Sequence, residues 1–292
     1  MSKHPDVVVI GGGIIGLTSA YFLARAGFAV EVLDRSDLGR EASWAGAGII
    51  PPGNPDRAAT PIDKLRAIGS AGFPAFSSEL RDLTGIGNGY RQCGGIEFLH
   101  AEDEYALSLW QNEGIGFERL SPEGLSRLEP ALGPVSGDPY LLPDCAQVRN
   151  PWHLRALIAA CEGVGVRLRP HEPVRHLETD GRQIVEVSLE SGRSVSAGQF
   201  LIAAGPWSEQ FLHWLGHRPH IHPVRGQIVL LRHPRPALLS RVVMLGKEYL
   251  VPRGDGRILV GSTEEPEAGF EKVNTESAVA HLRELAVRAV PA

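Results

Sequence analysis

The sequence predicts an α/β protein, α+β overall, in which a βαβ domain that binds a dinucleotide is interleaved with an antiparallel-sheet domain. Residues 7–34 supply the first observation, because a strand, a glycine-rich turn, a helix and a second strand follow one another there. Residues 90–143 and 223–263 supply the second, because short strands and frequent turns are typical of an antiparallel sheet. With 292 residues and 43% hydrophobic content, the chain can bury a core in both parts.

The βαβ unit carries the residues that a dinucleotide site requires. Residues 7–10 form an unbroken apolar run, as in a strand buried on both faces of a parallel sheet. Gly11, Gly13 and Gly16 have the G-x-G-x-x-G spacing, which serves a tight turn, close approach of backbone N–H groups to a pyrophosphate, and close helix packing. Asp34 ends the second strand, where a carboxylate accepts both hydroxyls of an adenosine ribose. These features together favour a Rossmann-like site over an unrelated glycine turn, but leave open which dinucleotide binds.

Composition and charge exclude several other classes of protein. The net charge is -5 and no block of like charge occurs, which argues against a nucleic-acid partner. The chain shows neither a secretory leader nor a long uninterrupted apolar run, so we expect a cytoplasmic protein with no membrane span. Cys93, Cys145 and Cys161 are far apart in the sequence, which favours free thiols in a reducing compartment and no metal site.

The segment after the βαβ unit is rich in small residues. Residues 43–50 alternate small side chains with glycine, so backbone amides can approach a ligand closely. A flexible surface loop has a similar composition, but the position directly after a ribose-binding unit favours the ligand. Thr60 then begins a helix that we expect to reach Gly85, with a hydroxyl cap, proline at its first position and a kink at Pro74.

In the second half of the chain, we expect further elements of the parallel-sheet domain first and antiparallel strands after them. Asn150 begins a helix that leads to a predicted strand at residues 166–169. Residues 200–205 predict an apolar strand that ends in Ala-Ala-Gly, a second place where backbone can pass close to a ligand. Antiparallel strands follow from Pro223, and residues 276–290 predict an amphipathic helix.

Five blocks of sequence, taken in order, point to one family. They are G-G-G-I-I-G at 11–16, A-S-W-A-G-A-G-I-I at 42–50, L-I-A-A-G-P-W-S at 201–208, V-R-G-Q at 224–227, and Y-L-V-P-R with G-R-I-L-V-G-S-T at 249–263. Together they resemble the FAD-dependent D-amino-acid oxidase family, and are most like its bacterial glycine oxidases of thiamine biosynthesis. The resemblance covers almost the whole chain and selects FAD among the dinucleotides.

The resemblance implies oxidation of a small amino or secondary-amino acid, such as glycine, sarcosine or a small D-amino acid. The neutral amine would lose a hydride from its α-carbon to flavin N5, the imino acid would hydrolyse to an oxo acid, and dioxygen would be reduced to hydrogen peroxide. No protein base is needed if the amine enters neutral. One alternative is a flavin dehydrogenase of the same fold that uses another electron acceptor. A second alternative is a truncated, catalytically inactive remnant that binds FAD or ADP.

Carried over by position, the resemblance assigns the cofactor contacts to glycines, to small or aliphatic residues, and to three charged or aromatic residues. They are Gly11, Gly13, Ile14, Ile15, Gly16, Asp34 and Arg35 for the adenosine end, Ser43, Gly46, Ala47, Gly48 and Ile49 for the pyrophosphate and flavin, Val174 for the adenine side, and Ala203, Ala204, Gly205 and Trp207 for closure over the cofactor.

The resemblance also places Tyr249 in the substrate pocket, where a phenol can donate to a carboxylate while its ring limits the pocket size. The residue by itself would be interpreted as a core aromatic on a strand. Arg253 lies beside a Gly-Asp-Gly turn, so we expect a solvated turn arginine rather than a carboxylate ligand. Glu264 stands where glycine oxidases commonly carry an apolar residue, which leaves the substrate preference open.

Family members continue past the last helix with a Gly-Leu-Arg-Pro stretch, whose arginine binds the substrate carboxylate, and with a segment that caps the flavin. The printed sequence ends before these features, so we expect a chain that lacks the C-terminal segment and exposes apolar surface suited to a homo-oligomer. The expected domain ranges are 1–84 and 146–222 for FAD binding, 85–145 and 223–273 for the substrate domain, and 274–292 for a helix that returns to the FAD-binding domain.

Overall fold

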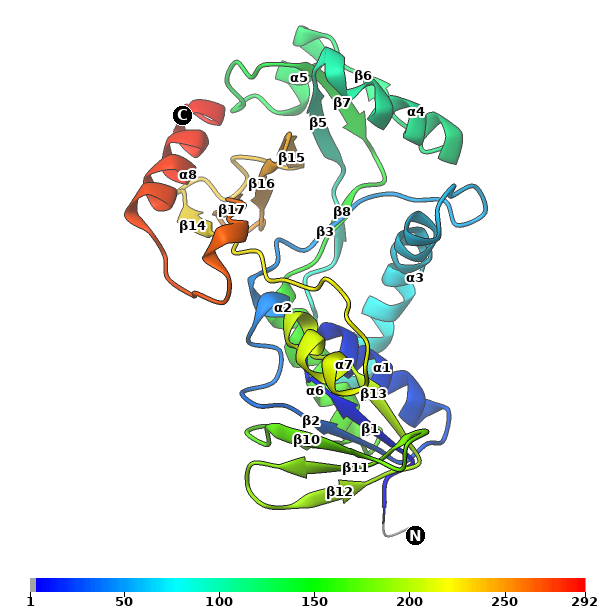
Figure 1. The fold of residues 1–292 in the computed structure, drawn as a ribbon. Coiled ribbons are helices and arrows are strands. Elements are labelled where there is room, and N and C mark those ends of the chain that lie inside the picture. Colours follow the sequence, from blue (N-terminus) through cyan, green and yellow to red (C-terminus); the bar gives the residue numbers. More distant parts are fainter. Residues whose placement is uncertain (1–3, 292) are drawn as a thin grey trace. The chain divides into compact units, whose positions relative to one another are not determined.

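The computed structural model describes residues 4–291, so residues 1–3 and 292 of the expected domain ranges lie outside the described residues. The chain forms two compact units (Figure 1). Unit 1 comprises Met1–Gly46, Ser78–Asn88 and Asn150–Pro223. Unit 2 comprises Ala47–Ser77, Gly89–Arg149 and Val224–Ala292. Residues 47–77, which we expected in the FAD-binding part, therefore group with unit 2.

Unit 1 is built on a parallel sheet with the strand order β13-β1-β2-β9. All three strand pairs are parallel, and Val8 and Val9 of the central strand are fully buried. A sheet of this kind needs cover on both faces, which explains the continuous apolar run in the sequence. The strands are β1 (Val7–Ile10), β2 (Val30–Leu33), β9 (Arg167–Arg169) and β13 (Gln199–Ile202).

Two helices cover one face of this sheet. α1 (Ile14–Arg25) and α6 (Asn150–Gly163) pack against each other, and the Cys161 thiol donates to the Leu17 carbonyl at 3.3 Å. A Cβ on Gly16 would lie 1.9 Å from the Gly11 carbonyl oxygen, so only glycine lets α1 approach the turn this closely. The helix and the strand at 166–169, predicted from the sequence, are confirmed as α6 and β9.

The opposite face of the parallel sheet packs on a small antiparallel sheet. Val8 and Ile10 alternate with Val9 along β1, and they join a buried cluster with Leu177, Val187 and Phe211. A tight turn at Ser191 and Gly192 joins the second and third strands of this sheet. The elements on this face are β10 (Val174–Thr179), β11 (Ile184–Leu189), β12 (Ser194–Ser196) and α7 (Ser208–Trp214).

Unit 2 contains a seven-stranded mixed sheet in the order β14-β17-β16-β15-β5-β7-β6. Most neighbours are antiparallel, as the sequence predicted, but β15 pairs with β5 in parallel. A second sheet has the order β3-β8-β4. The strands are β3 (Ile49–Ile50), β4 (Arg91–Gln92), β5 (Gly95–Leu99), β6 (Glu118–Arg119), β7 (Asp138–Leu142), β8 (Ala146–Gln147), β14 (Ile228–Arg232), β15 (Val242–Leu245), β16 (Glu248–Pro252) and β17 (Arg257–Gly261).

The remaining helices begin where the sequence provides caps. Thr60 accepts a hydrogen bond from the Asp63 amide at 3.2 Å, and its hydroxyl donates to the Asp63 carboxylate at 2.5 Å, so the helix predicted from Thr60 to Gly85 is confirmed. Pro74 lies inside this helix. The helices are α2 (Ala42–Ala45), α3 (Pro61–Thr84), α4 (Glu104–Glu113), α5 (Pro122–Leu128) and α8 (Glu276–Ala289), and short 3₁₀ segments lie at Ala101–Asp103, Gly205–Trp207 and Pro266–Ala268.

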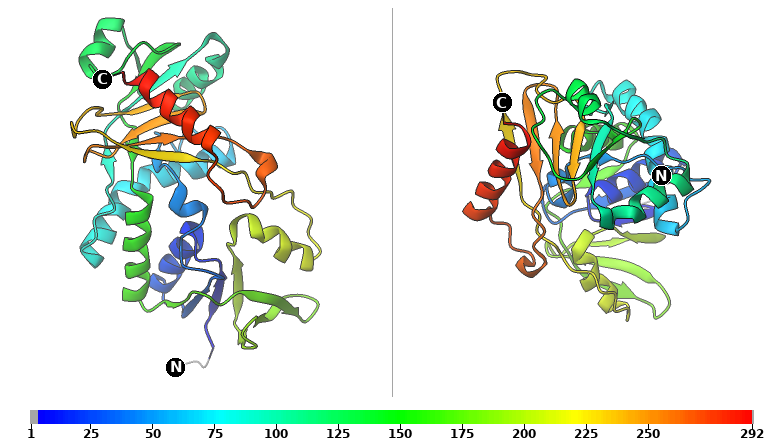
Figure 2. Two further views of the ribbon diagram at one scale, coloured as in Figure 1. Left: turned by 90° about the vertical axis from the view of Figure 1, so that its left-hand side faces the viewer. Right: turned by 90° about the horizontal axis from the view of Figure 1, so that it is seen from above.

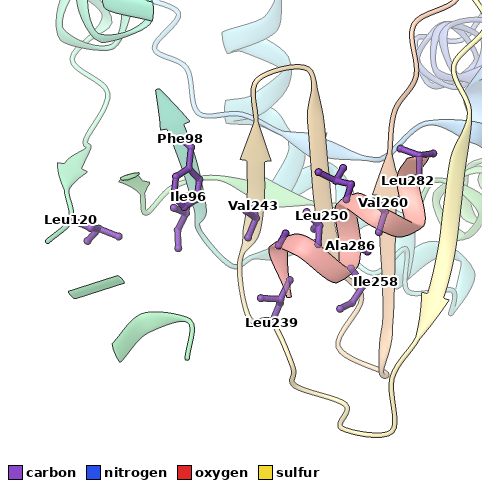
Figure 3. Close-up of a cluster of buried hydrophobic side chains, with 12 residues drawn as sticks. Ile96, Phe98, Leu120, Leu239, Val243, Leu250, Ile258, Val260, Leu282 and Ala286 are labelled. Atoms are coloured by element: carbon purple, nitrogen blue, oxygen red, sulfur yellow. The ribbon is translucent and has the colours of Figure 1, made fainter. Parts of the chain in front are cut away.

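The last helix differs from our expectation. We expected residues 274–292 to return to the FAD-binding part, but α8 lies across the sheet of unit 2, next to β14 and β17 (Figure 2). Leu282 and Ala286 are buried in one cluster with Leu250 and Val260 of the sheet (Figure 3). The amphipathic pattern identified the apolar face of the helix, but it carried no information on which apolar surface covers that face.

Two buried carboxylates fix loops of unit 2. Glu113, with a fully buried side chain, accepts from Arg66 at 3.0 Å and from the Asn54 amide at 3.4 Å. Glu129 accepts from the amides of Ser240 and Arg241 at 3.0 and 2.9 Å. Because a buried charge is costly without partners, these contacts hold the loops at positions that the sequence pattern could not show.

Within residues 4–291, no helix is long and apolar enough to cross a membrane. The same residues contain no group of three or more histidine, cysteine, aspartate or glutamate side chains arranged to hold a metal ion.

We predict that Leu282→Ala lowers the free energy of unfolding by about 2–5 kcal/mol, because it removes a buried side chain from the contact of α8 with the sheet. Val287 is the matched control, since it lies on the same helix with 67% exposure, and Val287→Ala should change stability by less than about 0.5 kcal/mol. Chemical denaturation measures both. Equal effects of the two substitutions would contradict the packing of α8 on the sheet.

Candidate functional site

Unit 1 contains a cavity of about 490 Å³ at the carboxyl ends of its parallel strands. Ligands of open α/β sheets bind at this edge, and the volume is within the usual range for a small-molecule site. The walls come from the glycine turn, the end of β2, the segment before α2, the start of β10 and the segment after β13. The lining residues among those predicted from the sequence are Gly11, Gly13, Ile14, Ile15, Asp34, Arg35, Ser43, Val174, Ala203, Ala204, Gly205 and Trp207.

The floor of the cavity is the turn between β1 and α1. Gly11 has φ +112°, and a Cβ at this position would lie 2.4 Å from the Ala203 carbonyl oxygen. Both the backbone angle and the close approach to the end of β13 therefore require glycine. The Gly11 amide donates to the Leu33 carbonyl at 2.8 Å, which ties the turn to β2 as well. The turn thus joins the ends of three strands at one point.

The N-terminus of α1 faces the same cavity. Gly13 precedes the first helical residue, and the Ile14 amide donates to the Ser43 hydroxyl at 2.9 Å. The first amides of a helix have no partner within the helix, and the helix dipole favours an anion there. The turn and the helix start can therefore hold a phosphate group.

Asp34 is fixed at the end of β2. The Gly12 amide donates to one carboxylate oxygen at 2.7 Å, and the Ser36 amide donates to the other at 2.8 Å. Each carboxylate oxygen has two lone pairs, so the oxygen bonded to Gly12 can still accept a hydroxyl, whereas the other also accepts the Ser36 hydroxyl at 3.2 Å and would take a ribose hydroxyl in its place. This geometry suits the two hydroxyls of a ribose.

Arg35 and Trp207 form a stacked pair on the cavity wall. The guanidinium carbon of Arg35 lies 3.7 Å from the centroid of the Trp207 ring, and Arg35 also pairs with Glu41 at 3.3 Å. A cation over an indole face is a favourable contact. The pair comes from residues 172 positions apart, 207 minus 35, which only the fold brings together.

Gly16 and Gly46 do not line the cavity but shape its surroundings. Gly16 lets α1 pack closely on the glycine turn. A Cβ on Gly46 would lie 2.4 Å from the side-chain nitrogen of Asn150, which donates to the Ser43 carbonyl at 2.9 Å. Glycine at this position therefore lets α6 hold the segment that contains Ser43.

Ala47, Gly48, Ile49 and Tyr249, which the sequence also predicted, belong to unit 2. Ala47, Ile49 and Tyr249 pack against the same buried cluster. Tyr249 is half-buried and stands opposite Gly261 in the sheet, and a Cβ on Gly261 would lie 2.9 Å from the phenol oxygen. The ring of Tyr249 therefore lies close to a glycine, in a position that a side chain at residue 261 would obstruct.

Arg253 corrects one expectation, because it is not a solvated turn arginine. Its guanidinium donates to the carbonyls of Ala47 and Val148 at 2.7 and 3.1 Å, and to the Gln147 side chain at 3.1 Å. Burial, with the neighbouring charge of Arg149, lowers its pKa to about 10. Arg253 thus fixes the segment that contains Ala47 and Gly48.

Glu264, the departure noted from the sequence, is exposed at the surface of unit 2. Its carboxylate pairs with Lys247 at 2.5 Å. The charge is thereby compensated in a solvated environment, and its presence requires no buried partner.

The sequence missed several residues that line the cavity of unit 1. Arg40 lies between Arg35 and Ser43, both of which the resemblance assigned to the cofactor, so it could have been considered from the sequence. The others reach the wall only through the fold, and no local pattern distinguishes them. They include Asp37, Glu172, Pro173, Glu190, Gln210 and Phe211.

Comparison of the sequence with known proteins identifies a matching family and several relatives. Residues 6–292 match the family model described as FAD dependent oxidoreductase. A glycine oxidase of Pseudomonas aeruginosa is 33% identical over 287 residues, which cover 98% of this chain and 78% of that protein. The Trichormus variabilis bifunctional protein ThiO/ThiG is 31% identical over 98% of this chain and 43% of its own length.

Solved structures are similar over nearly the whole chain. The crystal structure of glycine oxidase from Geobacillus kaustophilus has a TM-score of 0.91 at 27% identity, covering 99% of this chain and 79% of that one. Iminodiacetate oxidase from Chelativorans sp. BNC1 has a TM-score of 0.79 at 26% identity, covering 98% and 79%.

We predict that Gly11→Ala weakens binding of ADP by more than about tenfold, because its Cβ would displace the end of β13 from the cavity wall. Gly27 is the matched control. Gly27 has φ +95° but no atom within 4 Å of the position that a Cβ would take, so Gly27→Ala should cost about 1–2 kcal/mol of stability and leave ADP affinity unchanged. Calorimetric titration with ADP measures the affinity of both variants. Wild-type affinity in the Gly11 variant would contradict the steric requirement.

Proposed function

Since the chain belongs to the FAD dependent oxidoreductase family and is an enzyme of the glycine oxidase type, we propose that it oxidises a small amino or secondary-amino acid with dioxygen. Glycine and sarcosine are the proposed substrates. The products are the corresponding oxo acid, ammonia or methylamine, and hydrogen peroxide. For glycine, one water and one dioxygen are consumed for each glyoxylate, ammonia and peroxide formed.

The observation that carries the proposal is the cavity of unit 1, whose walls suit the ADP half of FAD. Asp34 would accept the ribose hydroxyls, and the N-terminus of α1 with Gly11 and Gly13 would face the pyrophosphate. Arg35 and Trp207 would border the nucleoside. When bound, FAD supplies the two-electron acceptor for the hydride of the substrate α-carbon.

Unit 2 would supply the contacts to the substrate. The Tyr249 phenol would donate to the substrate carboxylate, and its ring, which lies close to Gly261, would limit the size of the side chain accepted. Arg253 holds the chain at Ala47 and so keeps the neighbouring glycine segment in place. We assign no protein base, because a neutral amine needs no proton removed from it before hydride loss.

The free cysteines support a cytoplasmic location. Cys93, Cys145 and Cys161 are all unpaired as disulfides, and burial raises the pKa of Cys145 and Cys161 to about 12. Cys145 and Cys161 are thus buried thiols of low reactivity.

The purified 292-residue chain, supplied with FAD, is expected to be yellow and to form hydrogen peroxide from glycine or sarcosine in the presence of dioxygen. Oxygen uptake and a coupled peroxidase assay measure the reaction, with L-leucine as the control for a side chain too large for the pocket. Turnover with an artificial electron acceptor but none with dioxygen would replace the oxidase by a dehydrogenase. A chain that binds FAD yet oxidises none of these amines would contradict the proposal.

We predict that Tyr249→Phe raises KM for glycine by about tenfold or more and changes kcat by less, because it removes one hydrogen bond to a charged carboxylate. Tyr105→Phe is the matched control, since Tyr105 is 74% exposed, and it should leave both constants unchanged. Steady-state kinetics at several glycine concentrations separate the two constants. An unchanged KM in the Tyr249 variant would remove this residue from the substrate site.

A further inference from the structure

Arg40 lies on the wall of the cavity in unit 1, two residues before α2, and has no role in the cofactor contacts assigned so far. Its guanidinium carbon lies 3.8 Å from the centroid of the Trp44 ring, which holds the side chain in one direction. In the part of the chain that the structure describes, Arg40 makes no ion pair with any carboxylate. The cavity wall therefore carries a positioned guanidinium that forms no ion pair within the described chain.

The other charges on the wall make this cation unusual. Five acids line the cavity with two arginines, so the wall has an excess of negative charge that disfavours an anionic ligand. Arg35 pairs with Glu41, Asp37 pairs with His171 at 3.1 Å, and Glu172 pairs with Arg193 at 3.5 Å. Arg40 is thus the arginine of the wall without a carboxylate partner among residues 4–291. The acids are Asp34, Asp37, Glu41, Glu172 and Glu190.

A second arginine lies beside the same indole ring. The guanidinium carbon of Arg155, on α6, is 5.9 Å from the Trp44 centroid, and Arg155 also makes no ion pair among the described residues. Two like charges near one ring repel each other. Arg155 does not line the cavity, so of these two arginines only Arg40 can reach a ligand bound there.

The segment that carries Arg40 is also fixed against the N-terminus of α1. Three residues after Arg40, the Ser43 hydroxyl accepts the Ile14 amide at 2.9 Å, and the Ser43 carbonyl accepts from Asn150 at 2.9 Å. A helix N-terminus and a guanidinium on one cavity wall both favour the same kind of ligand, a phosphate group.

We propose that Arg40 is a ligand of the cofactor pyrophosphate, with Trp44 as the platform that holds its guanidinium ready. The proposal rests on the proposed function, because it takes FAD as the molecule in the cavity. Stacking on Trp44 restricts the rotamers of Arg40 before the ligand arrives, so less conformational entropy is lost on binding. The contact gives selectivity for a nucleoside diphosphate over a nucleoside.

The test compares ADP with adenosine, because the two ligands differ only in the diphosphate. In Arg40→Gln we expect the Kd for ADP to rise by about tenfold to a hundredfold, as for loss of a hydrogen bond to a charged group, and the Kd for adenosine to change by less than about twofold. Calorimetric titration of the full chain measures both. Arg40→Lys should cause an intermediate loss of ADP affinity, since lysine keeps the positive charge but lacks the planar guanidinium group. Arg40 is exposed, so the variant should keep the melting temperature of the wild type.

Arg155→Gln is the matched control, because Arg155 is an exposed arginine beside the same ring but does not line the cavity. It should change the Kd for ADP by less than about twofold. An unchanged ratio of the ADP and adenosine constants in the Arg40 variant would overturn the inference and leave the proposed function intact. Equal losses in the two variants would also overturn it, since a general field of positive charge would then be responsible. If the wild-type chain bound neither ADP nor FAD, the proposed function itself would fail.

Discussion

The approach of the glycine turn to the end of β13 is the contact on which the site in unit 1 depends. Gly11 combines φ +112° with a distance that leaves no room for a Cβ beside the Ala203 carbonyl. Because the Gly11 amide also bonds to Leu33, the ends of β1, β2 and β13 are held together at this one point. The cavity, the start of α1 and the position of Asp34 follow from that junction.

Around this junction, polar side chains are fixed mainly by neighbours far away in the sequence. Ser43 receives the Ile14 amide and is held from the other side by Asn150. In unit 2, the partly buried guanidinium of Arg253 holds Ala47 in a similar way by donating to carbonyl oxygens. A buried cation without a carboxylate partner is costly, so its three neutral acceptors act as a geometric constraint on that segment as well as compensating its burial.

The family resemblance accounts for the matches to known proteins. It does not show how the charged side chains of Glu264 and Arg253 are accommodated. Glu264 is exposed and paired with Lys247, so a residue that differs in character from its counterparts need not disturb the interior. Arg253, which the adjacent glycines suggested was solvated, is largely buried because β8 and the segment at Ala47 close over it. For Arg253, the local sequence identified the Gly-Asp-Gly turn but not the segments that cover the guanidinium.

The sequence by itself determined the βαβ unit, the glycines, the acid at Asp34 and the antiparallel texture of unit 2, because these follow from local backbone geometry and from the period of apolar residues. Only the tertiary structure decided that α8 packs on the sheet of unit 2, that Arg35 stacks on Trp207, and that Arg40 is left without a carboxylate partner in the described chain. The physical reason is that an apolar face or a charge specifies what kind of partner it needs, whereas the fold decides which partner comes within reach.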